Sequence, residues 1–383
     1  MKKLFLAVVL ILSLVLFANI KIGVVLPMTG GIAAFGEMSW QGIELAHEMY
    51  PEVLGEKIDL VLVDNRSEKT EAANAVSRVI DKEKVVAIIG EVASAHSLAG
   101  GAVAERKHIP MLTSSSTNPL VTNRKKYVSR VCFIDPYQGA AAAIFAYKNL
   151  NAKKAAVFID VEQDYSVGLA NFFKKKFQEL GGNYFIEFFK TGDQEFSAQL
   201  TDAINKNPDV LYITGYYPEI SLFARQARML GFKGPILAGD GAEAPELIKI
   251  GGDAVEGLYY TTHFHPKGAA TEMTKVFVEK FKEKYGSEPG AMHALGFDAY
   301  LVLRKAIEIA GKADPKAIAK AIRQVKNFPG ATGMITINKN GDAEKSVVID
   351  MVKNGEFTYV TTINQQIINF IKNSFPGSSG VFY

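Results

Sequence analysis

The sequence has a single cysteine among its 383 residues, Cys132, so no disulfide can form within the chain. It stands between Val131 and Phe133, an apolar setting that predicts a buried thiol with a packing role. A chain of this length can bury a core large enough to fold without disulfides, so their lack does not exclude export.

An excess of charge of either sign is also missing, because 43 lysines and arginines stand against 40 aspartates and glutamates. This balance gives no reason to expect nucleic acid or an anionic membrane as a partner. The chain has no P-loop, no H-E-x-x-H and no G-x-S-x-G, and its glycine-rich loop lacks the G-x-G-x-x-G spacing. His263 and His265 form an isolated H-x-H pair, which does not by itself predict a metal site. We therefore predict neither an enzyme nor a cofactor.

Long apolar runs are missing everywhere except at the N-terminus. Residues 1–18, MKKLFLAVVLILSLVLFA, have two lysines, an apolar stretch and a small residue at Ala18. This order is typical of a secretory signal peptide, and the stretch is short for a transmembrane helix. An uncleaved anchor is the alternative. We expect cleavage near Ala18 and a mature protein in the periplasm or outside the cell.

Short runs rich in Val, Ile and Leu alternate with amphipathic segments between residues 20 and 262. Such runs, without polar alternation, are typical of parallel strands that are buried on both faces by helices. Two series of this kind, one before about residue 135 and one from 153 to 262, predict an α/β protein with two Rossmann-like lobes. The region after residue 331 has the turns of a β-rich tail.

Polar residues gather where the strands of the first lobe end, which is where open parallel sheets bind ligands. Ser94 follows one strand and stands at the start of a helix. The alternative to a role in ligand binding is that Ser94 simply caps this helix. The next strand runs into TSSST, residues 113–117. Together they predict a carboxylate site in which Thr117 offers a hydroxyl and an N–H, while the Ser115 carbonyl accepts from a cation.

Acidic and aromatic residues follow the strands of the second lobe. Asp240 stands between two glycines and could pair with an ammonium group, although an Asx turn or a helix cap is the alternative. Tyr165, Tyr216 and Tyr217 follow other strands, and Phe35 lies in the first loop. Each ring alone could belong to the core, but their clustering predicts the wall of an apolar pocket.

Several stretches resemble the type I periplasmic binding proteins of ABC transporters, above all the leucine/isoleucine/valine-binding proteins. They are GGIAAFGEMSWQGIELA, IIGEVASAHSLA, PMLTSSSTNP, DVEQDYSVGLA, GYYPEISLFARQARMLGF and LAGDGA, which fall within residues 20–350. The resemblance implies two lobes with parallel central sheets joined by a three-strand hinge. Lobe 1 would comprise 19–135 and 265–337, and lobe 2 would comprise 136–264 and 338–383.

The resemblance also implies roles for individual residues. Ser94 and Thr117 would hold the carboxylate of an amino acid, and Asp240 would hold its ammonium with help from the Thr117 hydroxyl and the Ser115 carbonyl. The remaining implied pocket residues are Phe35, Ala93, Tyr165, Tyr216 and Met292. The chain departs from the family at two of these positions, since glutamate is common where Asp240 stands and an aromatic is frequent where Met292 stands.

By this resemblance the chain would be an extracytoplasmic binding protein that delivers a neutral apolar L-amino acid, branched-chain or aromatic, to the membrane permease of an ABC transporter. Two alternatives stay open. The chain could be a ligand-binding sensor module that feeds a receptor. It could also bind an amide or an aromatic acid, although Asp240 then has no ammonium to pair with.

Overall fold

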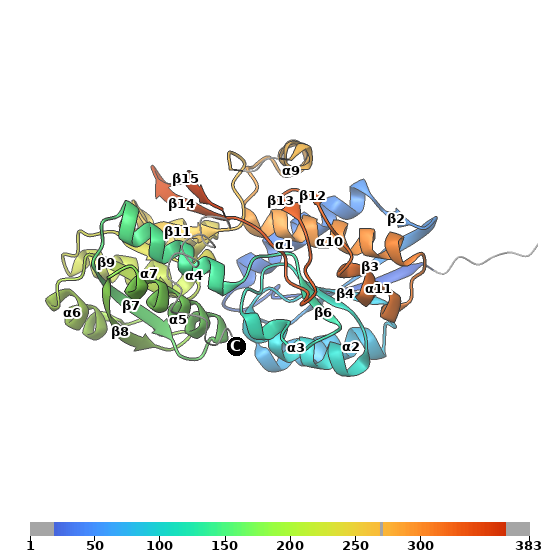
Figure 1. Cartoon of the computed structure of the whole chain (residues 1–383), viewed down its shortest axis with the longest axis horizontal. Helices are drawn as coiled ribbons and strands as arrows, with labels where there is room; N and C mark the ends of the chain where they lie inside the picture. Colours follow the sequence, from blue (N-terminus) through green and yellow to red (C-terminus); the bar gives the residue numbers. More distant parts are fainter. Residues whose placement is uncertain (1–18, 269–270, 365–383) are drawn as a thin grey trace, which may run out of the picture.

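The computed structural model describes residues 19–268 and 271–364. The predicted signal peptide and most of the C-terminal tail lie outside these residues. The described chain forms two α/β lobes set side by side, with lobe 1 on the right of Figure 1 and lobe 2 on the left. No helix in the described ranges has both the length and the apolar character that crossing a membrane requires.

The sheet of lobe 1 has the strand order β2-β3-β1-β4-β5-β6 and is parallel except where β2 meets β3. Its strands are β1 Ile20–Leu26, β2 Glu52–Val53, β3 Glu56–Asp64, β4 Ala87–Gly90, β5 Met111–Thr113 and β6 Val128–Arg130. Within β1, Ile22 and Val24 pack in one buried cluster and Val25 packs in another, so both faces of the sheet are covered. This double burial explains the continuous apolar runs.

Helices cover both faces of this sheet, α1 with α10 on one side and α2 with α3 on the other. The helices of lobe 1 are α1 Ala33–Met49, α2 Lys69–Asp81, α3 Ser94–Lys107, α9 Glu272–Tyr285, α10 Ala291–Ala310 and α11 Pro315–Ile322. A small hairpin of β12 Phe328–Gly330 and β13 Gly333–Ile335 follows.

The sheet of lobe 2 has the order β15-β14-β11-β10-β9-β7-β8. Its parallel strands are β7 Lys154–Asp160, β8 Asn183–Phe189, β9 Val210–Thr214, β10 Ile236–Ala238 and β11 Tyr259–Thr262. The tail adds an antiparallel hairpin at one edge, β14 Val347–Lys353 and β15 Glu356–Ile363. The helices are α4 Asp135–Ile144, α5 Asp164–Glu179, α6 Ser197–Asn205, α7 Tyr217–Met229 and α8 Pro245–Gly251.

Three crossings join the lobes in the described chain, one after β6, one after β11 and one between β13 and β14. The prediction of two mostly parallel sheets joined by a three-strand hinge is confirmed. Because the crossings alternate between lobes, segments far apart in sequence meet between them (Figure 1). The carboxyl ends of β4 and β5 in lobe 1 thus come to face those of β9 and β10 in lobe 2.

Candidate functional site

A pocket with a volume of about 240 Å³ lies between the lobes, beyond the carboxyl ends of the central strands. All predicted site residues except Ala93 line it, and Val92 and Gly241 line it in addition. Ala93 is buried as the N-cap of α3, between two residues that do line the pocket. The lining residues are Phe35, Val92, Ser94, Ser115, Thr117 and Met292 from lobe 1 and Tyr165, Tyr216, Asp240 and Gly241 from lobe 2.

Ser94 lies at the end of α3 that faces the pocket, but it does not cap the helix. It is the first helical residue, and its Oγ accepts a hydrogen bond from the N–H of Asn118 at 3.2 Å. The N-cap alternative is therefore wrong. No acceptor for the Ser94 hydroxyl hydrogen is seen within the described chain, so the hydroxyl can still donate to a ligand. The N-terminus of α3 adds a partial positive charge at the same place.

The hydroxyl groups of the TSSST segment have two different roles. Thr113 donates to the Glu91 carbonyl, and Ser115 and Ser116 donate to the Val92 carbonyl at 3.2 and 2.8 Å. These bonds tie the end of β5 to the end of β4. The Oγ atoms of Ser114 and Thr117 are buried and have no hydrogen-bond partner of good geometry in the described part of the chain. The Thr117 hydroxyl lies near the carboxyl of Asp135, where it acts against the rise in pKa that burial causes. Of the two residues only Thr117 lines the pocket, so its hydroxyl is the one placed to reach a ligand.

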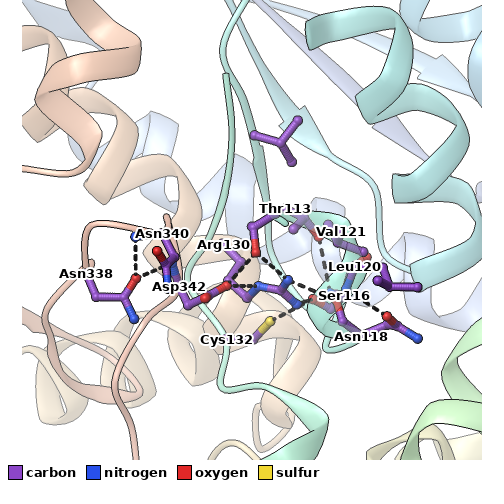
Figure 2. Close-up of polar contacts among 12 residues, drawn as sticks. Thr113, Ser116, Asn118, Leu120, Val121, Arg130, Cys132, Asn338, Asn340 and Asp342 are labelled. Atoms are coloured by element: carbon purple, nitrogen blue, oxygen red, sulfur yellow. Dashed lines mark hydrogen bonds and ion pairs between the residues drawn. The ribbon is translucent and has the colours of Figure 1, made fainter. Parts of the chain in front are cut away.

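Arg130, at the end of β6, holds this segment in place (Figure 2). It is completely buried, and its guanidinium donates to the carbonyls of Ser116 and Asn118, the two neighbours of Thr117. It also donates to Thr122 Oγ1 at 2.9 Å, and its Nε lies 2.8 Å from Asp342 Oδ1 on the third crossing. We call this set the Arg130 cluster. It fixes the backbone on both sides of Thr117.

The Asp240 carboxylate faces the pocket from lobe 2 and is held by three donors. Oδ1 accepts from Gln138 Nε2 at 2.6 Å and from the Tyr165 hydroxyl at 2.7 Å, and Oδ2 lies 2.8 Å from His263 Nε2. None of these is a local backbone bond, so the Asx-turn and cap alternatives are wrong. A carboxylate offers about four acceptor positions, which leaves one for a ligand.

The tyrosine that contacts Asp240 is a neutral donor. Tyr165 is buried, and this burial, together with the nearby Asp240 charge, raises its pKa well above the ordinary value. Its oxygen accepts from the Gly241 N–H at 3.2 Å, so its own hydrogen is directed to Asp240. Gln138 and His263 were not predicted. Gln138 lies in the first turn of α4, and His263 comes directly after β11 at the start of the second crossing. The sequence around neither residue has a pattern that indicates a ligand site.

Three of the four rings predicted from the sequence, Phe35, Tyr165 and Tyr216, line the pocket. Tyr165 and Tyr216 stack with centroids 5.4 Å apart, and Phe35 meets Tyr216 edge-on at 5.9 Å. Phe35 also meets Tyr217 at 5.1 Å, although Tyr217 is not a lining residue. Met292, in the first turn of α10, adds a flexible thioether to this lining.

Hydrogen bonds cross the cleft, so the two lobes are closed over the pocket. The Tyr217 hydroxyl donates to the Gly31 carbonyl at 3.1 Å, and Asn118 Nδ2 donates to the Asp164 carbonyl at 2.7 Å. Glu243 of lobe 2 accepts from the Ala291 N–H at the start of α10 at 2.6 Å. The result is an enclosed site with neutral donors on one wall and a carboxylate on the other.

Such a pocket between two α/β lobes is the arrangement of a two-lobed binding protein. The family model described as periplasmic binding protein matches residues 19–356. The structure resembles that of the leucine-binding protein LivK from Thermotoga maritima, with 65% identity and a TM-score of 0.90, over 91% of this chain and 99% of that one.

Two further proteins are similar to this chain, one in structure and one in sequence. LivJ from Streptococcus pneumoniae, solved in complex with isoleucine, is 27% identical with a TM-score of 0.85 over 90% of this chain and 99% of that one. The Leu/Ile/Val-binding protein BraC3 of Rhizobium johnstonii is 31% identical over 85% of this chain and 89% of its own. The chain therefore belongs to the periplasmic binding proteins, in the Leu/Ile/Val-binding family. This membership confirms the predicted family and the prediction that the chain is not an enzyme.

Proposed function

We propose that this chain is the extracytoplasmic binding protein of an ABC transporter and that its pocket holds a branched-chain L-amino acid. The observation that carries the proposal is the match to both charges of a zwitterion. Asp240 keeps one acceptor position for an ammonium, and Ser94 and Thr117 keep donors for a carboxylate. Burying either charge without a partner would be costly, so a ligand must satisfy both walls.

The apolar lining of the pocket supports an amino acid with an aliphatic side chain. The rings of Phe35, Tyr165 and Tyr216 with Met292 would surround an aliphatic side chain. The relatives described as leucine-binding, and the one solved with isoleucine, support the same class of ligand.

Delivery and location are parts of the same proposal. Cleavage near Ala18 would release the mature protein outside the cytoplasmic membrane. Closure of the lobes would present a continuous rim, formed by both lobes, to a membrane permease. N-terminal sequencing of the exported protein tests the first point, and the expected first residue is Asn19.

Ligand binding is tested by thermal unfolding of protein that has been freed of ligand by unfolding and refolding. A ligand at 100 times its dissociation constant stabilises the folded state by about 2.7 kcal/mol. We expect stabilisation by leucine, isoleucine or valine, and much less at the same concentration by leucinamide or 4-methylpentanoate, which each lack one charge of leucine. Asp240→Ala should remove the stabilisation. Equal stabilisation by 4-methylpentanoate would favour the aromatic-acid alternative and contradict the proposed role of Asp240.

A further inference from the structure

His263 lies just after β11, at the start of the second crossing between the lobes, and only 2% of its surface is exposed. Its ring stacks on Phe133 of the first crossing, with centroids 3.7 Å apart and planes inclined by 23°. Lys345 on the third crossing is buried and contributes a positive potential at the imidazole. The ring therefore lies where the three crossings of the hinge come together, and it reaches the pocket through its contact with Asp240.

The contact between His263 and Asp240 has a defined direction. Asp240 Oδ1 already accepts from Gln138 and Tyr165, so the third contact involves Oδ2 alone. Between a carboxylic acid and an imidazole nitrogen the hydrogen resides on the nitrogen, because the carboxylic acid is the stronger acid. His263 Nε2 must then carry the hydrogen that points at Oδ2, 2.8 Å away. This assigns the Nε2–H tautomer of the imidazole.

The surroundings of His263 keep this imidazole neutral. Nδ1 is buried, and the described residues give it no partner, so a second proton would create an unpaired buried N–H. Burial lowers the pKa of His263 and Lys345 lowers it further, while Asp240 acts in the opposite direction. Other titratable groups near Asp240 are Asp135 on α4 and Glu243, which follows the same short turn. A neutral His263 orients Asp240 without neutralising its charge.

We propose that His263 is a positioning residue for the ammonium group of the ligand: a neutral donor that fixes Asp240 Oδ2 and leaves the negative charge of Asp240 for the ligand to neutralise. The inference rests on the proposed function. A cation in place of His263 would neutralise Asp240, and an apolar residue would leave Oδ2 without this donor.

His263 does not act as one half of a metal site with His265. Nδ1 of His265 accepts from the Lys267 N–H at 3.1 Å, and its ring lies against Tyr359. No group of three or more His, Cys, Asp or Glu side chains arranged to hold a metal occurs in the residues that the structure describes. His265 is instead a matched control, since it shares the crossing with His263 and makes other contacts.

The test uses calorimetric titration of the mature, ligand-free protein with leucine and with 4-methylpentanoate, which lacks the ammonium. His263→Phe keeps a ring against Phe133 and removes the donor. We expect the Kd for leucine to rise roughly 10- to 100-fold, the effect of losing one hydrogen bond to a charged group. The Kd for 4-methylpentanoate should change much less. His263→Gln restores an amide donor and should recover most of the leucine affinity, and His265→Gln should behave as wild type.

Two outcomes of the titrations would overturn the inference. One is an equal loss of affinity for both ligands in His263→Phe, which indicates a purely structural role, and the other is an unchanged affinity for leucine. Failure of the wild-type protein to bind any amino acid would instead contradict the proposed function. A measurement that needs no variant is the ¹⁵N NMR spectrum of the imidazole near neutral pH. It should show the neutral Nε2–H tautomer, and an imidazolium or an Nδ1–H tautomer would also overturn the inference.

Discussion

Replacement of Arg130 by methionine tests how the carboxylate wall of the pocket is held. The variant keeps an unbranched side chain but removes a guanidinium that is completely buried. The Asp342 carboxylate then loses the guanidinium and keeps the donated bond of Thr122. The Ser116 carbonyl keeps only the weak Cys132 thiol donor at 3.4 Å, and the Asn118 carbonyl keeps only the Val121 N–H at 3.1 Å (Figure 2). Every group that loses a hydrogen-bond or ion-pair partner in this variant is buried.

The magnitude follows from burial. The Arg130 side chain is 0% exposed and the Asp342 side chain 12% exposed, so water screens their interaction weakly. Removing one partner of a buried ion pair costs about 3–5 kcal/mol, because the other charge stays behind uncompensated. We expect Arg130→Met and Asp342→Asn each to lower the free energy of unfolding. The double variant should lose less than the sum of the two losses, with a coupling of about 1–3 kcal/mol.

Urea-induced unfolding of the ligand-free protein gives the free energy of unfolding of wild type, of the two single variants and of the double variant. Arg106→Met is the control, because Arg106 is exposed near the end of α3 in the same lobe, and it should change stability by less than about 0.5 kcal/mol. A coupling near zero between Arg130 and Asp342 would refute the argument that the ion pair carries the stability. Unchanged leucine affinity in folded Arg130→Met would refute the claim that the Arg130 cluster places Thr117.

Three further predictions concern acid–base behaviour and selectivity. Burial raises the pKa of Glu91 from 4.5 to about 8, so its contribution to stability is present below about pH 4.5 and is lost as the pH rises through about 8. The free energy of unfolding of Glu91→Gln, measured with urea, should therefore rise relative to that of wild type by about 1.4 kcal/mol per pH unit over that range. A difference between the two proteins that does not change with pH would contradict this prediction. The pKa of His263 is lowered from 6.5, so leucine affinity should begin to fall only below that pH, as an imidazolium competes with the ligand ammonium for Asp240. Titrations at decreasing pH should show a smaller fall in His263→Gln, and an equal fall would count against this competition. Met292→Ala should widen the apolar end of the pocket and change the ratio of the leucine Kd to the phenylalanine Kd by a factor of about 10–200 in favour of phenylalanine. An unchanged ratio would place the side chain of the ligand elsewhere.

The fold and the lining of the pocket could be predicted because both depend on local patterns. Apolar runs without alternation indicate buried parallel strands, and the residues just after those strands meet at one edge of each sheet. Thr117 and Asp240 were found in this way. The resemblance added Met292, which lies in a helix far along the chain and follows no strand.

The residues that hold the pocket in shape were not predictable in this way. Gln138 and Asp240 are 102 residues apart in sequence, and Arg130 meets Asp342 only because the third crossing returns beside β6. Nothing in the local sequence around these residues indicates such a contact. For Ser94 only the N-cap alternative failed, since α3 begins one residue earlier than a capping role requires and the hydroxyl lies at the pocket instead.

The placement of the two charge-binding walls explains how an amino acid would close the lobes. In the proposed assignment the carboxylate is held by Ser94 and Thr117 of lobe 1, and the ammonium is held by Asp240 of lobe 2. Neither lobe alone can satisfy both charges, so the ligand has a higher affinity for the closed form than for an open one. A ligand shifts a conformational equilibrium only by this difference in affinity. An analogue lacking one charge would contact one wall and gain little from closure, so both charges are needed to close the lobes as well as to bind.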